Sequence, residues 1–286
     1  MTVASSRIWA RGAVDRGLLV VGLILGIMAV TAAKLILAGL DEIGQAGERP
    51  SIDAPAPEAR SEPGGESALE LARTGRWREL QQGIAAGLPP DPPGTEPRAR
   101  TALMYAAVAG RFGAAQALLE AGARPDRRDE SGNTALILAT DHHHFDIARS
   151  LLDAGADASA ISAQGGGTLN GPARQGDNGL IERLIEGGAD PDAAMREGWR
   201  PLHYAAGGGH NGAIRRLLAA GADIHAADNA GLDALMYAAG QGHLPTVSWL
   251  LERGADRTRR ARDGRTAEDM AAAGGFADVV VTLRTR

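Results

Sequence analysis

The sequence predicts an all-α repeat solenoid, in which small helical units stack on one another. One observation is a set of glycines that recur every 33 residues, and a second is the apolar pair that precedes each of them. Leu151-Leu152, for example, precedes Gly155 with two residues between. A fixed period of this length is typical of stacked supersecondary units. The five glycines are Gly122, Gly155, Gly188, Gly221 and Gly254.

Each unit is expected to hold two short helices joined by a tight turn. In the unit around residue 140, Thr134 stands at the start of the first helix, where its side chain suits an N-cap. The turn falls at His143, and the second helix ends at Leu152. Most other units carry glycine at the position of His143, because a left-handed residue ends the helix there. Paired alanines such as Ala205-Ala206 let neighbouring helices pack closely.

The composition and motifs favour a binding module over an enzyme. The chain has 286 residues and a formal net charge of −5, which does not indicate a nucleic-acid partner. It has no cysteine, so disulfides and thiolate metal sites are excluded. No Gly-x-Ser-x-Gly motif is present, and every carboxylate pair is placed by the repeat itself. We therefore expect no catalytic residues, no cofactor and no small-molecule substrate.

The N-terminal region predicts a membrane anchor. Residues 1–17 are expected to form a cytoplasmic tail with Arg7, Arg11 and Arg16, and residues 18–40 to form a transmembrane signal-anchor helix. These 23 residues would make roughly 34 Å of helix, enough to cross a bilayer. The arginines before the segment place the repeats outside the cytoplasm. Lys34 is the only lysine among 30 basic residues, a bias that suggests a bacterium, so we expect a single pass of the inner membrane and a periplasmic repeat domain.

Other interpretations of this region stay open. Thr31-Ala32-Ala33 offers small residues for cleavage, so the segment is also consistent with a secretory signal that releases the protein to the periplasm. A buried soluble helix, or insertion in the opposite direction with a cytoplasmic repeat domain, are further alternatives. Residues 41–65 are rich in proline and charge, and we expect a disordered linker there.

The repeats resemble those of the ankyrin family. The resemblance is carried by Pro201-Leu202-His203-x-Ala205-Ala206, by Gly209-His210 and by Gly221-Ala222-Asp223. It covers residues 66–286 and implies helix–turn–helix units, joined by hairpin-like fingers and stacked into a curved solenoid that binds a protein partner. The expected units are an N-terminal cap (66–98), repeats at 99–131, 132–164, 165–197, 198–230 and 231–263, and a C-terminal cap (264–286).

The repeat at 165–197 departs from the family pattern. Gly167 stands where threonine would cap the first helix, and Asn170-Gly171-Pro172 replaces the His-x-Ala stretch. Proline beyond the first turn of a helix loses a hydrogen bond and costs about 3 kcal/mol. We therefore expect a short or irregular first helix, either as a hinge or widened groove or as a tolerated defect.

Two polar stretches offer alternative functions. Asp141-His142-His143-His144 suggests a ligand- or metal-binding turn, although His144 occupies the slot of the family's Gly-His histidine and adjacent side chains rarely converge on one ion. The other interpretation is a polar turn on the concave rim. Arg257, Arg259, Arg260 and Arg262 form a basic finger, which is either a solvated face or a contact for an acidic partner or lipid headgroups. Trp77 and Trp249 are expected in the core.

The resemblance also predicts where an unidentified protein partner binds. In ankyrin-like stacks, contacts usually fall on finger tips and on the exposed ends of first helices. Trp199 follows a finger-turn glycine, so we expect it either to fold back on the neighbouring finger or to form a hot spot with Arg196 and Leu232 on the concave face. The predicted partner-binding residues are Glu130, Ser131, Asn133, Asp141, His142, Gln164, Arg174, Gln175, Arg196, Glu197, Trp199, Asn229, Leu232, Gln241, Arg262 and Arg265.

Overall fold

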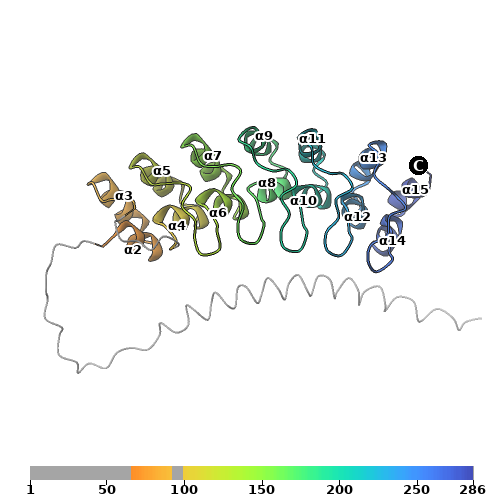
Figure 1. The fold of residues 1–286 in the computed structure, drawn as a ribbon, viewed down its shortest axis with the longest axis horizontal. Helices are drawn as coiled ribbons and strands as arrows, with labels where there is room; N and C mark the ends of the chain where they lie inside the picture. The colour runs from red at the N-terminus through yellow and green to blue at the C-terminus, as the bar shows by residue number, and fades with distance from the viewer. Residues whose placement is uncertain (1–65, 92–98, 286) are drawn as a thin grey trace, which may run out of the picture. The chain divides into compact units, whose positions relative to one another are not determined.

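The structure, a computed structural model, describes residues 66–91 and 99–285, and within them it consists of seven pairs of short helices. Figure 1 shows the pairs in a row, with the first helix of each pair nearer the connecting loops. The predicted all-α stack of paired helices is confirmed. The pairs are α2 (Ala68–Arg73) and α3 (Trp77–Ala85), α4 (Ala102–Val108) and α5 (Phe112–Glu120), α6 (Ala135–Asp141) and α7 (Phe145–Asp153), α8 (Asn170–Gln175) and α9 (Asn178–Glu186), α10 (Pro201–Gly207) and α11 (Asn211–Ala219), α12 (Ala234–Gly240) and α13 (Leu244–Glu252), and α14 (Ala267–Ala273) and α15 (Ala277–Thr285).

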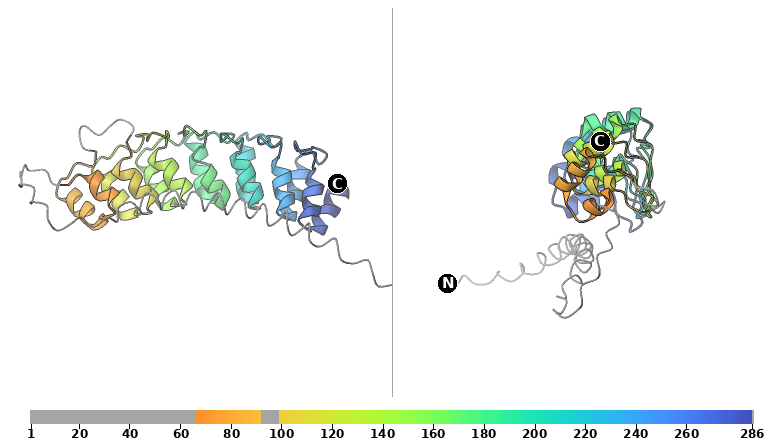
Figure 2. Two further views of the ribbon diagram at one scale, coloured as in Figure 1. Left: turned by 90° about the horizontal axis from the view of Figure 1, so that it is seen from below. Right: turned by 90° about the vertical axis from the view of Figure 1, so that its left-hand side faces the viewer.

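Neighbouring units pack helix against like helix. The first helices α4 and α6 contact each other, as do the second helices α5 and α7, and each first helix also contacts its own second helix. Figure 2 shows the successive helices side by side along the stack. Each internal unit therefore packs against the units on both sides of it, as a repeat architecture requires.

Caps at both ends set the length of each helix. The hydroxyl of Thr134 accepts a hydrogen bond from the backbone N–H of Ile137 at 3.3 Å, which caps the start of α6. At the end of α7, Gly155 has a φ of 83°, and the N–H of Ala156 donates to the carbonyl of Leu151 at 2.9 Å. This is the left-handed ending that glycine provides at low steric cost. The recurring glycines of the sequence are thus helix terminators.

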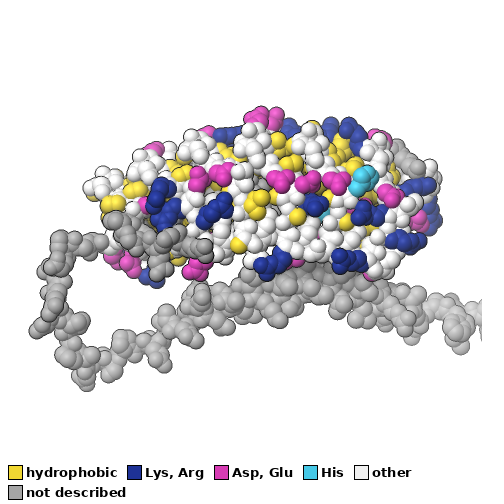
Figure 3. Space-filling view, viewed as in Figure 1, with side chains coloured by type: hydrophobic (Ala, Val, Ile, Leu, Met, Phe, Trp, Pro, Cys, Tyr) yellow, Lys and Arg dark blue, Asp and Glu magenta, His cyan; other side chains and the backbone are white. Residues whose placement is uncertain are grey.

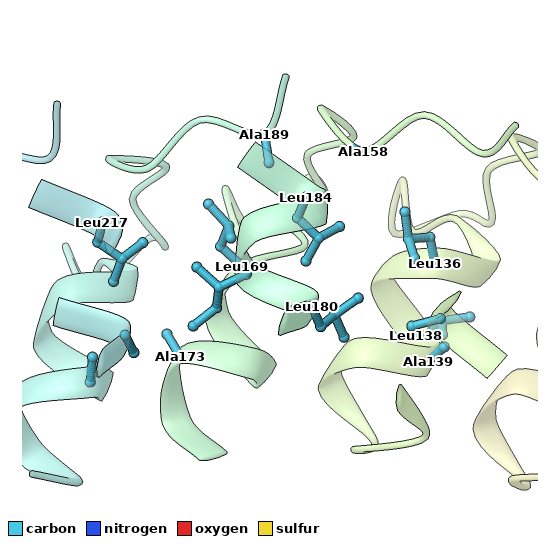
Figure 4. Close-up of a cluster of buried hydrophobic side chains, with 14 of the residues drawn as sticks. Leu136, Leu138, Ala139, Ala158, Leu169, Ala173, Leu180, Leu184, Ala189 and Leu217 are labelled. Carbon is cyan, nitrogen blue, oxygen red and sulfur yellow. The ribbon is translucent and has the colours of Figure 1, made fainter. Parts of the chain in front are cut away.

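The apolar pairs form the core between units. The first member of each pair is fully buried, whereas the second is half-buried and packs against the core. In Figure 4, Leu169, Leu180 and Leu184 point into the space between neighbouring helices. Burying a leucine side chain contributes about 1.5–3 kcal/mol, so these residues supply much of the stacking energy. The fully buried members are Leu118, Leu151, Leu184, Leu217 and Leu250.

The irregular repeat has a short first helix, as expected, but not for the expected reason. Helix α8 begins only at Asn170, so Pro172 is its third residue. The N–H groups of a helix's first turn have no intrahelical partner, and Pro172 therefore costs no helical hydrogen bond. The prediction that Pro172 lies beyond the first turn is wrong. The helix starts late because Gly167 has no side chain to cap it, and the hydroxyl of Thr168 donates to the carbonyl of Ala158 at 2.7 Å instead.

Gly171 brings α8 unusually close to α6. A Cβ atom at this position would lie 1.9 Å from the carbonyl oxygen of Thr140 and 2.6 Å from its carbonyl carbon. Such a contact is with backbone, which cannot move aside as a flexible side chain would. The glycine is therefore required for the contact between these two units.

The predicted membrane segment, residues 18–40, and the predicted linker, residues 41–65, lie outside the described residues. Among the residues that are described, no helix is long and apolar enough to cross a membrane.

Replacing Gly171 with alanine is expected to destabilise the stack by about 2 kcal/mol or more, because α8 and α6 must separate to admit the methyl group. The matched control is Gly207→Ala at the end of α10, where a Cβ would meet no atom within 4 Å. This control should stabilise the protein slightly, since alanine is the better helix former. Unfolding in urea, followed by circular dichroism, measures the stability of both variants. Equal midpoints for the two variants would show that the units separate without cost.

Candidate functional site

Hairpin fingers connect the units and are linked to one another. In one finger, the N–H of Met195 donates to the carbonyl of Trp199 at 2.8 Å. Between fingers, Arg196 donates its N–H to Gln164 at 2.8 Å, and Asn229 donates to Glu197 at 3.0 Å. The finger tips are thus held in register by backbone hydrogen bonds. We call the surface made by the fingers and the first helices the inner face; it corresponds to the concave face of the sequence-based prediction.

The predicted partner-binding residues are accessible in the structure. Asn133, Trp199 and Leu232 are half-buried, and the others are exposed. Some already have partners within the chain. The amide of Asn229 donates to the carbonyl of Arg196 at 2.9 Å, and Arg265 pairs with Asp263 at 2.6 Å.

An aromatic cluster forms where two units meet on the inner face. The ring of Trp199 lies 5.0 Å from that of Tyr204 on α10 and 4.5 Å from that of Tyr237 on α12, measured between ring centres. His203 lies edge-on to Trp199 at 6.5 Å. We define these four residues as the aromatic cluster. Rings in tilted and edge-on contact stabilise one another beyond the effect of burial alone.

Hydrogen bonds hold two members of the cluster, His203 and Tyr237, in place. His203 is fully buried, accepts from the N–H of Arg200 through Nδ1 at 3.2 Å and donates from Nε2 to the carbonyl of Ala226 at 3.0 Å. This pattern requires the neutral ring, in agreement with burial, which lowers the pKa of His203. The hydroxyl of Tyr237 donates to Asp228 at 2.6 Å. Burial and this hydrogen bond raise the pKa of Tyr237.

The two tyrosines were missed by the sequence-based prediction. It placed Trp199 with Arg196 and Leu232, whereas the structure places its ring against Tyr204 and Tyr237, one of which belongs to the next unit. A signal was present: the chain has three tyrosines, and all occupy the same position in a Tyr-Ala-Ala stretch.

Arg174 joins the aromatic cluster to the preceding unit. Its guanidinium carbon lies 5.7 Å from the centre of the Tyr204 ring, within the range of a cation–π contact. Its Nη2 donates to the carbonyl of Asp141 at 3.3 Å and to Nε2 of His143 at 3.2 Å. One exposed arginine on α8 thus contacts both α6 and α10.

His143 is strained, as its place in the sequence suggested. Its φ is 62°, and among the described residues it is the non-glycine residue with a positive φ. Arg174 and Gln175 both direct N–H donors at its Nε2, at 3.2 Å and 3.5 Å. That nitrogen must therefore be an acceptor, which requires a neutral ring. Burial, followed by the charge of Arg174, lowers the pKa of His143 in the same sense.

The histidines of this turn do not gather into a set of metal ligands among the described residues. His144 Nε2 lies 3.1 Å from the carbonyl of Val108 in the preceding unit, and His210 and His243 make the same link to Arg174 and Gly207. Within residues 66–91 and 99–285, no three histidine, cysteine or acidic groups converge on a common point. The geometry thus gives the metal-binding alternative no support.

Asp141 is the acidic member of this stretch. Protein atoms crowd it on the inner face, and this loss of water raises the pKa of its carboxyl to about 6, against the opposing charge of Arg174.

The basic finger near the C-terminus is largely structural. Arg257 donates to the carbonyls of Leu283 and Arg284 at the end of α15, and Arg259 donates to the carbonyl of His225 in the preceding unit. Acidic and basic side chains are interspersed on the face shown in Figure 3, and basic ones gather at the C-terminal end. Trp77 and Trp249 are half-buried and pack against the core, as predicted.

Comparisons with known proteins agree with this architecture. A family model described as "Ankyrin repeats (3 copies)" matches residues 80–162, 172–261 and 221–285. The uncovered stretch, 163–171, contains the irregular start of α8. Among solved structures, the crystal structure of EF0377, an ankyrin repeat protein, shares 28% sequence identity with this chain at a TM-score of 0.55. That similarity covers 64% of this chain and 96% of the other. No curated protein matches the chain.

Replacing His143 with glycine is expected to stabilise the stack by about 1 kcal/mol, because glycine adopts the positive φ without steric cost. His142→Gly is the matched control: its φ is −88°, so glycine there only adds chain entropy to the unfolded state and should destabilise. The melting temperatures of both variants, measured by thermal unfolding, test this prediction. If His143→Gly is less stable than the original protein, the stabilisation from the imidazole contacts exceeds the steric cost of the positive φ at His143.

Proposed function

Because the chain belongs to the ankyrin-repeat family, we propose that residues 66–286 act as a protein–protein interaction module, a scaffold or adaptor with no catalytic role. The observation that carries this proposal is the aromatic cluster with Arg174 on the inner face. Tryptophan, tyrosine and arginine are the residues most enriched among the hot spots of protein interfaces. Here they adjoin one another across three successive units.

The cluster is also suited to binding because its members are already ordered. Tyr237 is tied to Asp228, and His203 to the carbonyl of Ala226, so little side-chain entropy is left to lose when a partner docks. Trp199 remains half-buried, which leaves part of its indole accessible to a partner. Such preorganised aromatic surfaces gain affinity chiefly through a slower dissociation rate.

The proposal is tested by site-specific photo-crosslinking in cells. A photoreactive amino acid is placed at Gln164 or Gln241 on the inner face, and at Gln116 or Arg215 on exposed second helices as controls. We expect a defined crosslinked protein from the inner positions only. Equal products from both sets, or none from either, would contradict a partner-binding inner face.

Trp199→Ala is expected to weaken capture of that partner by roughly 2 kcal/mol or more. The substitution also removes ring contacts with Tyr204 and Tyr237, so its melting temperature must be measured in parallel. Gln116→Ala on α5 serves as the surface control. If binding is unchanged while stability falls, Trp199 is a packing residue and the hot spot lies elsewhere.

We also propose that residues 18–40 tether this module to the inner membrane and that the repeats face the periplasm. The support is the sequence itself, namely the apolar segment and the arginines before it. A tether would hold the module near membrane-bound partners and raise their effective concentration.

Alkaline phosphatase fused after Arg286 is expected to be active, because Arg7, Arg11 and Arg16 should keep the N-terminus in the cytoplasm. Retention of the fusion in washed membranes separates an anchor from a cleaved signal. An inactive phosphatase, together with an active cytoplasmic reporter at the same site, would instead place the module in the cytoplasm.

A further inference from the structure

We propose that His143 forms a pH-sensitive link between the units of α6 and α8, which holds in neutral solution and opens when mild acid protonates the imidazole. This inference goes beyond the proposed interaction function and does not depend on a partner. Three features of the molecule support it: the strain at His143, the donors that face its ring and the make-up of this junction.

His143 occupies a position that favours glycine. Its φ is 62°, and the corresponding residue of each of the other six described units is a glycine with a φ between 63° and 77°. A residue with a side chain is strained in this left-handed region, and such strain tends to be kept where it serves a function. The contacts of the imidazole indicate what that function is. The six glycines are Gly75, Gly110, Gly176, Gly209, Gly242 and Gly275.

The Nε2 atom of His143 accepts hydrogen bonds from the next unit. Arg174 donates from Nη2 at 3.2 Å, and Gln175 donates from its side-chain amide at 3.5 Å. A guanidinium can only donate, so this imidazole nitrogen must carry a lone pair and no proton. Protonation turns the nitrogen into a donor that faces two donors, and it places a second positive charge beside Arg174. Mild acid therefore opposes the link through both geometry and charge.

The charged and titratable groups that face His143 act in the same direction. Loss of water around the ring lowers the pKa of His143 most, followed by the charge of Arg174 from α8. His142 and His144, in the same turn, lower the pKa further. At the start of α7, Phe145 lies edge-on to the imidazole at 5.9 Å and carries no charge. All of these surroundings favour the neutral ring that the hydrogen bonds require.

The direction of the pH effect follows from the lowered pKa of His143. An ordinary histidine has a pKa of about 6.5, so below that pH the unfolded chain takes up a proton that the folded stack resists. The contribution of His143 to stability therefore falls as the pH falls. Asp141 acts in the opposite sense, because loss of water raises its pKa to about 6 and the folded stack takes up that proton more readily. The link must therefore be measured between proteins that both retain Asp141.

The junction that His143 joins is held differently from its neighbours. At three other junctions a histidine reaches a carbonyl of the preceding unit, whereas here the corresponding residue is Asp177, which pairs with Arg149 at 2.5 Å. Arg174 adds the contact with His143 and also covers the ring of Tyr204 on α10 at 5.7 Å. Opening the link thus loosens this junction and releases Arg174 beside the aromatic cluster. The three histidines are His144, His210 and His243.

The first test is a nuclear magnetic resonance titration of the full-length protein in detergent, with its histidines labelled with 15N. The signals of His143 are assigned with His143→Gln. At neutral pH we expect its Nε2 to carry no proton, and we expect the midpoint of its titration to lie below about pH 6.5. Arg174→Gln should shift this midpoint upwards, because it removes the cation beside the ring. Arg253→Gln, at an arginine that covers Trp249 on α13, is the matched control and should leave the midpoint unchanged.

The second test is the melting temperature at two pH values. His143→Gln keeps the backbone strain and a neutral acceptor oxygen, but its side chain cannot be protonated. Relative to this variant, the original protein should lose about 1–3 °C of melting temperature between neutral pH and about pH 5.5, as expected for one exposed charge contact. Excess EDTA should leave this loss unchanged, because protons and not metal ions open the link.

A protonated Nε2 at neutral pH, or a His143 midpoint that Arg174→Gln does not move, would overturn the proposal. So would a melting-temperature difference that is equal at both pH values, because His143 would then be a structural contact only. A loss that EDTA abolishes would assign the effect to a bound metal ion and reject the protonation link as well. None of these results bears on the interaction module, which the crosslinking experiment tests separately.

Discussion

Contact between neighbouring units is the interaction on which the whole structure depends. The helices are six to nine residues long, and helices shorter than about 12–15 residues are marginal in water on their own. Each unit therefore owes its helices to the leucines that it buries against the next unit. Leu184 and Leu217, for example, are fully buried although they belong to second helices of successive units. Because these leucines build the core between units, the residues of the inner face are not needed for it.

The irregular unit shows how strictly the spacing between units is kept. At its second helix, Asp177 replaces the histidine that links other units through a carbonyl, and it binds Arg149 of the preceding unit at 2.5 Å instead. At its first helix, Gly171 lets α8 contact the backbone of α6 directly. The lost link to the preceding unit is thus replaced by an ion pair, and the first helix of the irregular unit also lies unusually close to that same neighbour. The defect is local, and the stack continues through it.

The period and the caps could be predicted from sequence because they repeat in register, so each unit supports the assignment of the others. Thr134 at a helix start and Gly155 at a helix end are local features of this kind. The aromatic cluster could not be predicted in the same way, because Tyr237 meets Trp199 only through the stacking of two units. The role of Pro172 was misjudged for a related reason: its cost depended on where α8 begins, and that depends on Gly167.

The proposed binding role of the aromatic cluster would couple binding to stacking, because the cluster lies across two units. Trp199 and Tyr204 belong to one unit and Tyr237 to the next, so a ligand on the cluster contacts both sides of the α10–α12 junction. A ligand that binds only the intact junction stabilises it by mass action, and it does so without any rearrangement of the core. Because each unit depends on its neighbours, stabilising this junction raises the free energy of unfolding of the whole stack. The aromatic cluster is therefore a product of the repeat order and cannot be supplied by one unit alone.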